Sequence, residues 1–469
     1  MESWLNQAGA SGLDSLQLAD FSSTGRGVRT LRRFEEGEKI LTIPYSVLWT
    51  VKHAHADPIL GPALLSVWPP LTVDNTLAIY ILFVRSHGSR YNGKGSHVAA
   101  LPAKYTSSIF FTEAELEICA GTSLYTTTKQ LNRQIEDDFS ELVARILGRH
   151  PELFPHDKFT IEDYKWALCT VWSRAMDFKL GDGDSLRVVA PFADMLNHSS
   201  EVKQCHIYDA VSGNLSVLAG RNYEPGDQVF INYGPVPNSR LLRLYGFVVS
   251  ANPNDSYDLV LTTHHMAPFF EKKYKLWVLA GLNSTSTVSL TQTDPLPNSV
   301  LQYLRIQRLN EFDLVSKVPY QKITASERIS DSNEVEVLRF LIESISSLLD
   351  SFGIQLEKLV EQLAEGFYTL GGNAWSAAHV SLGEQRVLRL TRKAAEDLLA
   401  AVETGSGNKR GPSSIPARCA NCKKVSVQLM LCGRCNEVKY CGRDCQVAHF
   451  KEHKAFCRAT MAKNSSKKD

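Results

Sequence analysis

Residues 191–200 read PFADMLNHSS, and residues 224–249 read EPGDQVFINYGPVPNSRLLRLYGFVV. The apolar run at 228–232 lies between turn residues, a pattern that predicts a short strand. Both stretches combine this turn-rich backbone with polar or aromatic side chains, so they are candidates for one functional site. Those side chains are Asp194, Asn197, His198, Tyr233, Tyr245 and Phe247.

Further short strands are predicted beside these stretches, at 186–190, 205–210 and 214–219, because β-type runs alternate there with Gly, Asp and Asn. Residues 12–55 are also rich in turn signals and short β-like runs. They include Gly25-Arg26-Gly27, where the backbone can turn tightly or be approached closely because glycine has no Cβ. This part of the chain is therefore expected to be β-rich.

Apolar residues at helical spacing predict several helices between and after the β-rich segments. One of them is expected at 160–178, with Thr160 as its N-cap and acidic residues in its first turn. The chain is expected to become helical again after residue 266. The other predicted helices lie at 74–86, 112–147, 335–349, 354–364 and 384–403. The fold class expected from this pattern is α+β.

The composition is that of an ordinary globular chain. Its 469 residues suggest roughly three domains. With 43% hydrophobic and 22% charged residues, the chain is not disordered, collagen-like or a coiled coil. Charge is distributed unevenly: residues 418–469 carry a net charge of +8, and the remainder carries −7. A basic segment often faces an acidic partner, but this one gives no support for direct nucleic-acid binding.

Two features bear on the compartment. The longest apolar run, 77–84, is much shorter than the roughly 18–20 residues that span a bilayer. The first residues, MESWLNQAGA, lack the basic and apolar regions of a secretory signal. We therefore expect no membrane association and a cytoplasmic and/or nuclear location. In that reducing environment a dense cysteine cluster favours metal over disulfides.

Seven of the ten cysteines lie between 419 and 457. With one histidine they form a string of ligands with zinc spacing, enough for two tetrahedral Zn²⁺ ions. So short a segment cannot bury enough apolar surface to fold alone, so the metal must supply folding energy and the sites are structural. The predicted ligands are Cys419, Cys422, Cys432, Cys435, Cys441, Cys445, His453 and Cys457.

This spacing resembles the MYND zinc finger over the whole of 419–457. The resemblance implies interleaved sites, with the first, second, fifth and sixth ligands on one zinc and the others on the second. Spacing alone also allows a sequential pairing. MYND modules dock proline-containing peptides, so a partner of that kind is implied. Phe450 stands where the family usually has tryptophan, and this departure bears on the docking groove.

Taken in order, the glycine pair at 25–27, the D-x-x-N-H of 194–198 and the Y-G-x-x-x-N-x-x-L-x-x-x-Y-G-F of 233–247 resemble a SET domain. More narrowly, they resemble the subfamily of the Rubisco large-subunit methyltransferase, which also has a Ser-Arg pair at a helix end, here Ser173-Arg174. The resemblance covers about residues 12–400. It implies a β-rich SET fold with a helical insertion, followed by an all-α substrate-binding domain.

The implied domain boundaries follow from these matches. The SET domain spans 12–234, with the helical insertion at about 56–185. The end of the SET fold and the helical substrate-binding domain occupy 235–402. A linker of Gly, Ser, Pro and charged residues at 403–418 precedes the MYND module at 419–457, and a basic tail follows at 458–469.

The resemblance also implies a cofactor, S-adenosylmethionine, whose amino-acid end would pair with the Arg174 guanidinium. Tyr233 is expected to be the catalytic residue, a hydroxyl at the pocket floor that positions the acceptor and need not act as a base. The acceptor pocket is expected to be lined by Met176, Tyr245 and Phe247. The expected cofactor-binding residues are Gly25, Arg26, Gly27, Arg174, Asp194, Asn197, His198 and Tyr233.

The expected reaction is transfer of the sulfonium methyl group to a protein lysine, whose amine must first lose a proton in a water-poor channel. Met176 favours lysine, because the actin-histidine branch of the family has asparagine at that position. Two alternatives stand beside this interpretation. The chain could methylate a histidine, or it could be a non-catalytic adaptor in which the MYND module is the working part.

Overall fold

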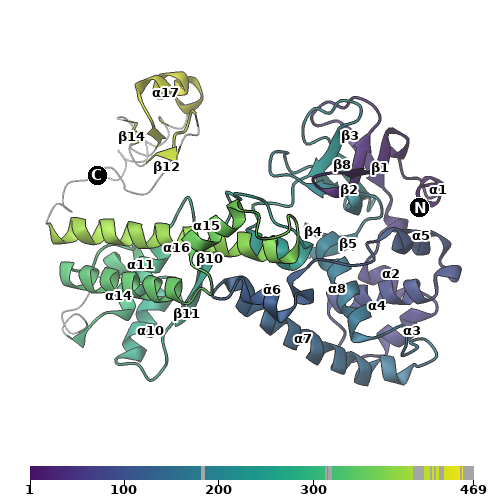
Figure 1. The fold of residues 1–469 in the computed structure, drawn as a ribbon, viewed down its shortest axis with the longest axis horizontal. Helices are drawn as coiled ribbons and strands as arrows, with labels where there is room; N and C mark the ends of the chain where they lie inside the picture. Colours follow the sequence, from purple (N-terminus) through teal and green to yellow (C-terminus); the bar gives the residue numbers. More distant parts are fainter. Residues whose placement is uncertain are drawn as a thin grey trace. The chain divides into compact units, whose positions relative to one another are not determined.

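The computed structural model describes residues 1–180, 185–311, 314, 320–404, 417–422, 425–426, 429–432, 438–454 and 457. They divide into two compact units, which are described separately (Figure 1). Most of the expected linker at 403–418 and the whole of the tail at 458–469 lie outside the described residues. The first unit comprises Met1–Leu116, Leu124–Val249 and Gly371–Ser376, and the second comprises Glu117–Ser123, Ser250–Leu370 and Ala377–Asp469.

The first unit is built around small sheets. The largest has the strand order β1-β2-β9-β6, in which β6 and β9 are parallel and the other pairs antiparallel. A second sheet has the order β3-β8-β7, and β4 pairs with β5. The strands are β1 (Leu16–Phe21), β2 (Gly25–Thr30), β3 (Lys39–Ile43), β4 (Ala175–Lys179), β5 (Ser185–Val189), β6 (Asn197–His198), β7 (His206–Tyr208), β8 (Leu215–Leu218) and β9 (Gln228–Ile231).

This arrangement confirms the expected β-rich body. The strands predicted at 186–190, 205–210, 214–219 and 228–232 are present, each with bounds that differ by one or two residues. The sheet order brings β2, near the start of the chain, beside β9, some 200 residues later. β9 also pairs with β6, so the two stretches that carry the candidate site residues, 191–200 and 224–249, meet at neighbouring strands.

Helices of the first unit pack around a continuous apolar core. The most deeply buried is α4, whose residues 76–84 are all buried and which packs against α8. The helices are α1 (Glu2–Gln7), α2 (Val51–His55), α3 (Leu60–Leu65), α4 (Val73–Ser86), α5 (Asn92–Ala100), α6 (Glu113–Glu117), α7 (Ser123–Arg145), α8 (Ile161–Arg174) and α9 (Asn238–Tyr245).

Two predicted helices differ from the structure. Thr160 caps α8 with Asp163 in a capping box, as its sequence indicates, but the helix ends at Arg174 rather than at 178. Residues 175–179 form β4, because pairing with β5 competes with continued helix. The helix expected at 112–147 is divided into α6 and α7, and Gly121 between them has a φ of 90°, outside the helical region.

The second unit is mainly helical around its own core. It contains one feature that the sequence interpretation omitted, an antiparallel hairpin of β10 (Ser256–Thr262) and β11 (Thr285–Thr291). Alternating Thr, Ser and Val in β11 were a signal for it. The helices are α10 (Phe270–Leu279), α11 (Asn298–Gln307), α13 (Tyr320–Thr324), α14 (Asp331–Asp350), α15 (Leu356–Ala364) and α16 (Asn373–Glu403).

A buried ion pair joins two helices of the second unit. Arg305 on α11 donates through Nε and Nη2 to the Glu334 carboxylate on α14, at 2.7 and 2.6 Å. Its remaining Nη1 donates to the carbonyl oxygen of Ser326. Because both charges are satisfied in this two-pronged geometry, the pair fixes the register of the two helices.

The C-terminal segment has its own small framework. Strand β12 (Ala417–Arg418) pairs with β13 (Val425–Ser426), and β14 (Met430–Leu431) pairs with β15 (Lys439–Tyr440). Helix α17 (Arg443–Ala448) follows. Among the helices that the structure describes, none is both long and apolar enough to cross a membrane.

Candidate active site and zinc module

Two cavities in the first unit share a wall. The smaller cavity has a volume of about 350 Å³ and the larger cavity about 490 Å³. The shared residues come from the end of α8, the turn before β6, the segment that follows β9 and the end of α9. Segments far apart in the sequence therefore converge. The shared residues that matter below are Ser173, Arg174, Asp194, Tyr233 and Tyr245.

Most of the sequence-predicted site residues line one or both cavities. Met176 on β4 lines the smaller one, and Arg26 and Asn197 line the larger one. Phe247, expected in the acceptor pocket, lines only the larger cavity, beside the residues expected at the cofactor. Gly25, Gly27 and His198 are not among the described residues that line either cavity.

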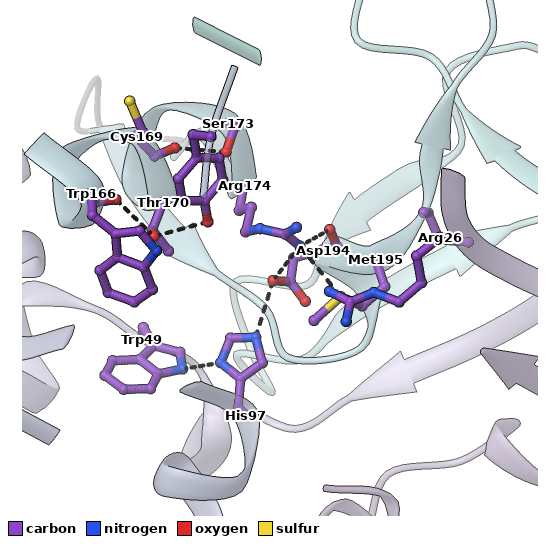
Figure 2. A network of polar contacts seen from close by, with 12 residues as sticks. Arg26, Trp49, His97, Trp166, Cys169, Thr170, Ser173, Arg174, Asp194 and Met195 are labelled. Atoms are coloured by element: carbon purple, nitrogen blue, oxygen red, sulfur yellow. Dashed lines mark hydrogen bonds and ion pairs between the residues drawn. The ribbon is translucent and has the colours of Figure 1, made fainter. Parts of the chain in front are cut away.

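The shared wall is organised by a buried ion pair (Figure 2). Arg174 donates through Nη1 to Asp194, reaching the carbonyl oxygen at 2.8 Å and Oδ2 at 3.2 Å. The same nitrogen contacts the Met195 sulfur at 3.3 Å, and the Arg26 guanidinium contacts that sulfur from the other side at 3.7 Å. Two arginines thus converge on one point of the larger cavity.

A chain of hydrogen bonds extends from this pair into the core. His97 on α5 contacts Asp194 Oδ2 through Nε2 at 3.0 Å, and its Nδ1 lies 3.0 Å from the Trp49 indole nitrogen. An indole N–H can only donate, so Nδ1 of His97 must accept and its proton must be on Nε2. The imidazole is therefore neutral and donates to the carboxylate. It fixes the orientation of Asp194, which in turn holds Arg174.

The ion pair keeps both groups charged despite burial. Burial opposes ionisation of Asp194, but the His97 N–H and the Arg174 guanidinium outweigh it and hold the pKa of this carboxyl below its usual value. Two buried atoms of the pair, Asp194 Oδ1 and Arg174 Nε, have no hydrogen-bond partner among the described residues. Unsatisfied polar atoms are costly in such a place, so they mark a position that fits a polar ligand.

Tyr233 lies at the centre of an aromatic stack. Its ring is 4.7 Å from that of Tyr245 and 4.9 Å from that of His198, centroid to centroid. Its hydroxyl donates to the carbonyl oxygen of Leu196 at 3.0 Å, and its backbone N–H donates to His198 Nδ1 at 3.1 Å. Burial raises the pKa of the phenol above its usual value, so the hydroxyl is neutral.

Packing and backbone conformation within the protein explain why residues 25 and 27 are glycines. A Cβ on Gly27 would lie 2.4 Å from the Gln228 amide nitrogen and 2.8 Å from that of Asn197. Gly25 has a φ of 67°, which strains other residues. The Asn197 side-chain amide donates to the backbone carbonyl of Arg26 at 3.1 Å. Glycine at 27 therefore allows Asn197 to hold β2 in place.

Several residues of the site were not predicted from the sequence. Trp49 and His97 orient Asp194, and Tyr105 lines the larger cavity. Gln204, His206 and Arg240 line the smaller cavity. Burial lowers the pKa of His206 below its usual value. Arg240 stands at a variable position of the 233–247 motif and the others stand in no motif, so their only signal is their place in the fold.

The C-terminal cysteines gather into two groups. The donor atoms of Cys419, Cys422, Cys441 and Cys445 all lie within 4.8 Å of one another, and those of Cys432, His453 and Cys457 do likewise. This grouping agrees with the interleaved pairing and not with the sequential one. Cys435, the expected fourth ligand of the second group, lies outside the described residues.

The donor atoms fit zinc in chemistry and spacing. Sulfur–sulfur distances are 3.5 Å for Cys422 and Cys441, 3.4 Å for Cys441 and Cys445, and 3.9 Å for Cys432 and Cys457. Thiolates at the corners of a tetrahedron with Zn–S bonds of about 2.3 Å stand about this far apart. A disulfide, at about 2.05 Å, is excluded for these pairs. Four soft donors around one centre describe a closed, structural site.

Comparison with protein families gives three matches along the chain. The SET domain family matches residues 25–234, the Rubisco LSMT substrate-binding family matches 264–388, and the MYND finger family matches 419–457. Together they account for both units and the C-terminal module.

Known relatives and structures extend these matches. Actin-histidine N-methyltransferase of Canis lupus familiaris is 26% identical over 412 residues, which cover 84% of this chain and 68% of the relative. The Mus musculus enzyme of the same name is 24% identical over 409 residues, covering 84% and 67%. A crystal structure of the SET domain of LSMT bound to lysine and AdoHcy superposes with a TM-score of 0.75 at 23% identity, covering 86% and 91%.

The SET-domain match, the relatives named as methyltransferases and the LSMT-like fold, solved with AdoHcy bound, identify a SET-domain methyltransferase that depends on S-adenosylmethionine. The chain contains a SET domain, a substrate-binding domain of the Rubisco LSMT type and a C-terminal MYND finger.

The hydrogen-bond chain through His97 predicts a large loss of stability when it is broken. His97→Ala should lower the free energy of unfolding by about 2–3 kcal/mol, because the Trp49 N–H and Asp194 both lose a buried partner. Urea unfolding measures this change. The exposed His156 gives a matched control, whose alanine variant should stay within about 0.5 kcal/mol of wild type. Equal stability of the two variants would show that His97 holds nothing in place.

The interleaved zinc sites predict an unusual metal count. The double variant Cys422→Ser/Cys445→Ser alters two ligands of one group, so the purified chain should lose one zinc and keep one. In a sequential pairing these cysteines would belong to different sites, and both ions would be lost. Elemental analysis against wild type, expected to hold two zincs per chain, separates the two outcomes.

Proposed function

We propose that this chain transfers a methyl group from S-adenosylmethionine to a lysine side chain of a protein substrate. The observation that carries the proposal is the shared wall: two cavities meet at Arg174, Asp194 and Tyr233. In this proposal the larger cavity holds the cofactor and the smaller cavity admits the acceptor. The wall between them is where donor and acceptor atoms can be aligned.

The larger cavity suits the amino-acid end of the cofactor, which carries a carboxylate and an ammonium group. Arg26 and Arg174 both line it, and their guanidinium groups can take the carboxylate. Asp194 Oδ1, buried and without a partner among the described residues, can accept from the ammonium group. The Arg174–Asp194 pair thus offers a positive and a negative group to a ligand end that carries one charge of each sign. When bound, S-adenosylmethionine supplies an electrophilic methyl group on its sulfonium sulfur.

The smaller cavity suits a neutral amine. Met176 is buried on its wall, and the aromatic rings of Tyr233 and Tyr245 stack beside it. A lysine amine is almost wholly protonated in water at neutral pH, and the apolar surface of Met176, Tyr233 and Tyr245 disfavours the charged form on this side of the cavity. These side chains therefore help the acceptor to lose its proton before it reacts.

Tyr233 would position the acceptor rather than remove its proton. Its hydroxyl hydrogen is committed to the Leu196 carbonyl, so the phenol oxygen presents lone pairs that can accept from an amine N–H. Burial raises the pKa of this phenol and so keeps it neutral. A neutral phenol is a poor base. An oxygen held by such a bond orients the nitrogen lone pair toward the methyl group.

Lysine and histidine remain the two candidate acceptors. Met176 offers no hydrogen bond to an imidazole, and the Y-G-F sequence at 245–247 departs from the actin-histidine branch, so both support lysine. The curated relatives support histidine, since they are named for methylation of a histidine in actin. A solved structure of LSMT bound to lysine has the same fold.

Mass spectrometry of the modified side chain distinguishes the acceptors. Cell extract would be labelled by the purified full chain with tritiated S-adenosylmethionine, and the labelled peptides would be sequenced. Methyl-lysine supports the proposal, and methyl-histidine alone replaces it with the second candidate. If the chain binds the cofactor but labels no protein, the adaptor interpretation holds instead, with the MYND module recruiting partners.

The role of Tyr233 predicts a separation of binding from turnover. Tyr233→Phe should lower kcat by roughly 10- to 100-fold, because the acceptor loses its hydrogen-bond partner in the transition state. Cofactor affinity, measured by calorimetry, should change little. Tyr208→Phe is the matched control, since Tyr208 on β7 is not among the described residues that line either cavity. A variant at 233 with wild-type kcat would remove Tyr233 from the mechanism.

A further inference from the structure

One charged side chain at the smaller cavity has no partner of opposite charge among the described residues. Arg240 lines this cavity, and its residue is exposed. Within the part of the chain that the structure describes, its guanidinium makes no hydrogen bond and no ion pair. Arginine usually gains from a carboxylate partner, for which its planar group is well shaped.

The other charges of the cavity wall are already paired. Arg174 and Asp194 form the buried pair described above. Asp177 on β4 is engaged by Arg187 on the neighbouring strand, at 3.0 Å. Arg187 also contacts Asp74 at 3.0 Å. Among the described charged residues of the cavity wall, Arg240 therefore differs from the others in having no ion-pair partner.

The position of Arg240 is not explained by helix stability. It stands in the first turn of α9, where the aligned peptide dipoles already present partial positive charge. A cation is disfavoured there, and α9 has no acidic residue in its first turn to offset it. The N-cap, Pro237, makes no side-chain capping bond. The start of α9 is thus a place of positive potential at the cavity, which attracts an anion.

The charge of Arg240 reaches the place where the acceptor would lie. Tyr245, at the end of α9, lines both cavities. Burial raises the pKa of its phenol, and the Arg240 charge opposes this effect. A charge that affects Tyr245 electrostatically also affects a substrate chain that passes over the entrance of the smaller cavity.

We propose that Arg240 selects protein substrates that carry an aspartate or glutamate side chain close to the methylated residue. This inference rests on the proposed function and names the sequence class that the site accepts. The acidic side chain would pair with the guanidinium while the acceptor side chain enters the cavity. A basic residue at the same place would face an uncompensated cation and be rejected.

A peptide library tests the proposal with the full-length protein. Each peptide has a central acceptor, lysine in one set and histidine in the other. Each of the three positions on either side is occupied in turn by aspartate, lysine or alanine. At one or more positions the wild-type chain should show a kcat/KM roughly two- to fivefold higher for aspartate than for lysine, the size expected for one exposed charge pair. The preference should weaken in high salt.

Charge reversal identifies the residue responsible. Arg240→Glu should invert the preference at the same position, so that lysine there is favoured over aspartate. The matched control is Arg133→Glu, the same change at an exposed arginine on α7 that lines neither cavity. It should keep the wild-type preference.

The outcomes are distinct for the two proposals. Transfer to the library without any acidic preference, or a preference that Arg240→Glu leaves unchanged, overturns the role of Arg240 and leaves the proposed function standing. Failure of the wild-type chain to methylate any peptide or any extract protein overturns the proposed function, and the inference about Arg240 with it.

Discussion

The ion pair of Arg174 and Asp194 is the interaction on which the site depends. Two charges are buried between two cavities, where neither has enough water to solvate it. They remain charged because each is held by the other and because His97 supplies a further N–H to the carboxylate. The pair keeps the end of α8 against the turn before β6. Without it, both cavities would lose their common wall.

This pair also links the chemistry to the core. Its supporting chain ends at Trp49, one of the largest fully buried side chains, so the orientation of Asp194 is set by close packing rather than by solvent. A site that must align donor and acceptor atoms gains from such rigid support. The unsatisfied atoms, Asp194 Oδ1 and Arg174 Nε, are then the part of the wall left available for a ligand.

Much of the fold could be predicted from local sequence, and the predicted elements that differ from the structure do so for physical reasons. Thr160 and Asp163 form a capping box because that signal is local. The end of the same helix was misplaced because β4 forms through pairing with a strand ten residues later, which no helical pattern reveals. The β10–β11 hairpin was missed because its pairing spans a whole helix and loop, although β11 itself is rich in threonine.

The candidate site divides in the same way. Residues in short motifs, such as Asn197 and Tyr233, could be identified because each motif is contiguous. Trp49 and His97 could not, since they reach Asp194 from 145 and 97 positions earlier in the chain through contacts that only the fold creates. Arg240 lies inside a motif but at one of its variable positions, so its importance follows only from the charges around it.

The interleaved grouping of the C-terminal cysteines has a consequence for assembly. A nascent or cleaved chain that stopped between Cys432 and Cys441 would hold several thiolates yet no complete metal site. Neither site is complete before the chain reaches Cys445, and shorter products would expose reactive sulfur. Metal loading is thus delayed until most of the module has been synthesised, and cleavage between Cys432 and Cys441 removes ligands from both sites at once.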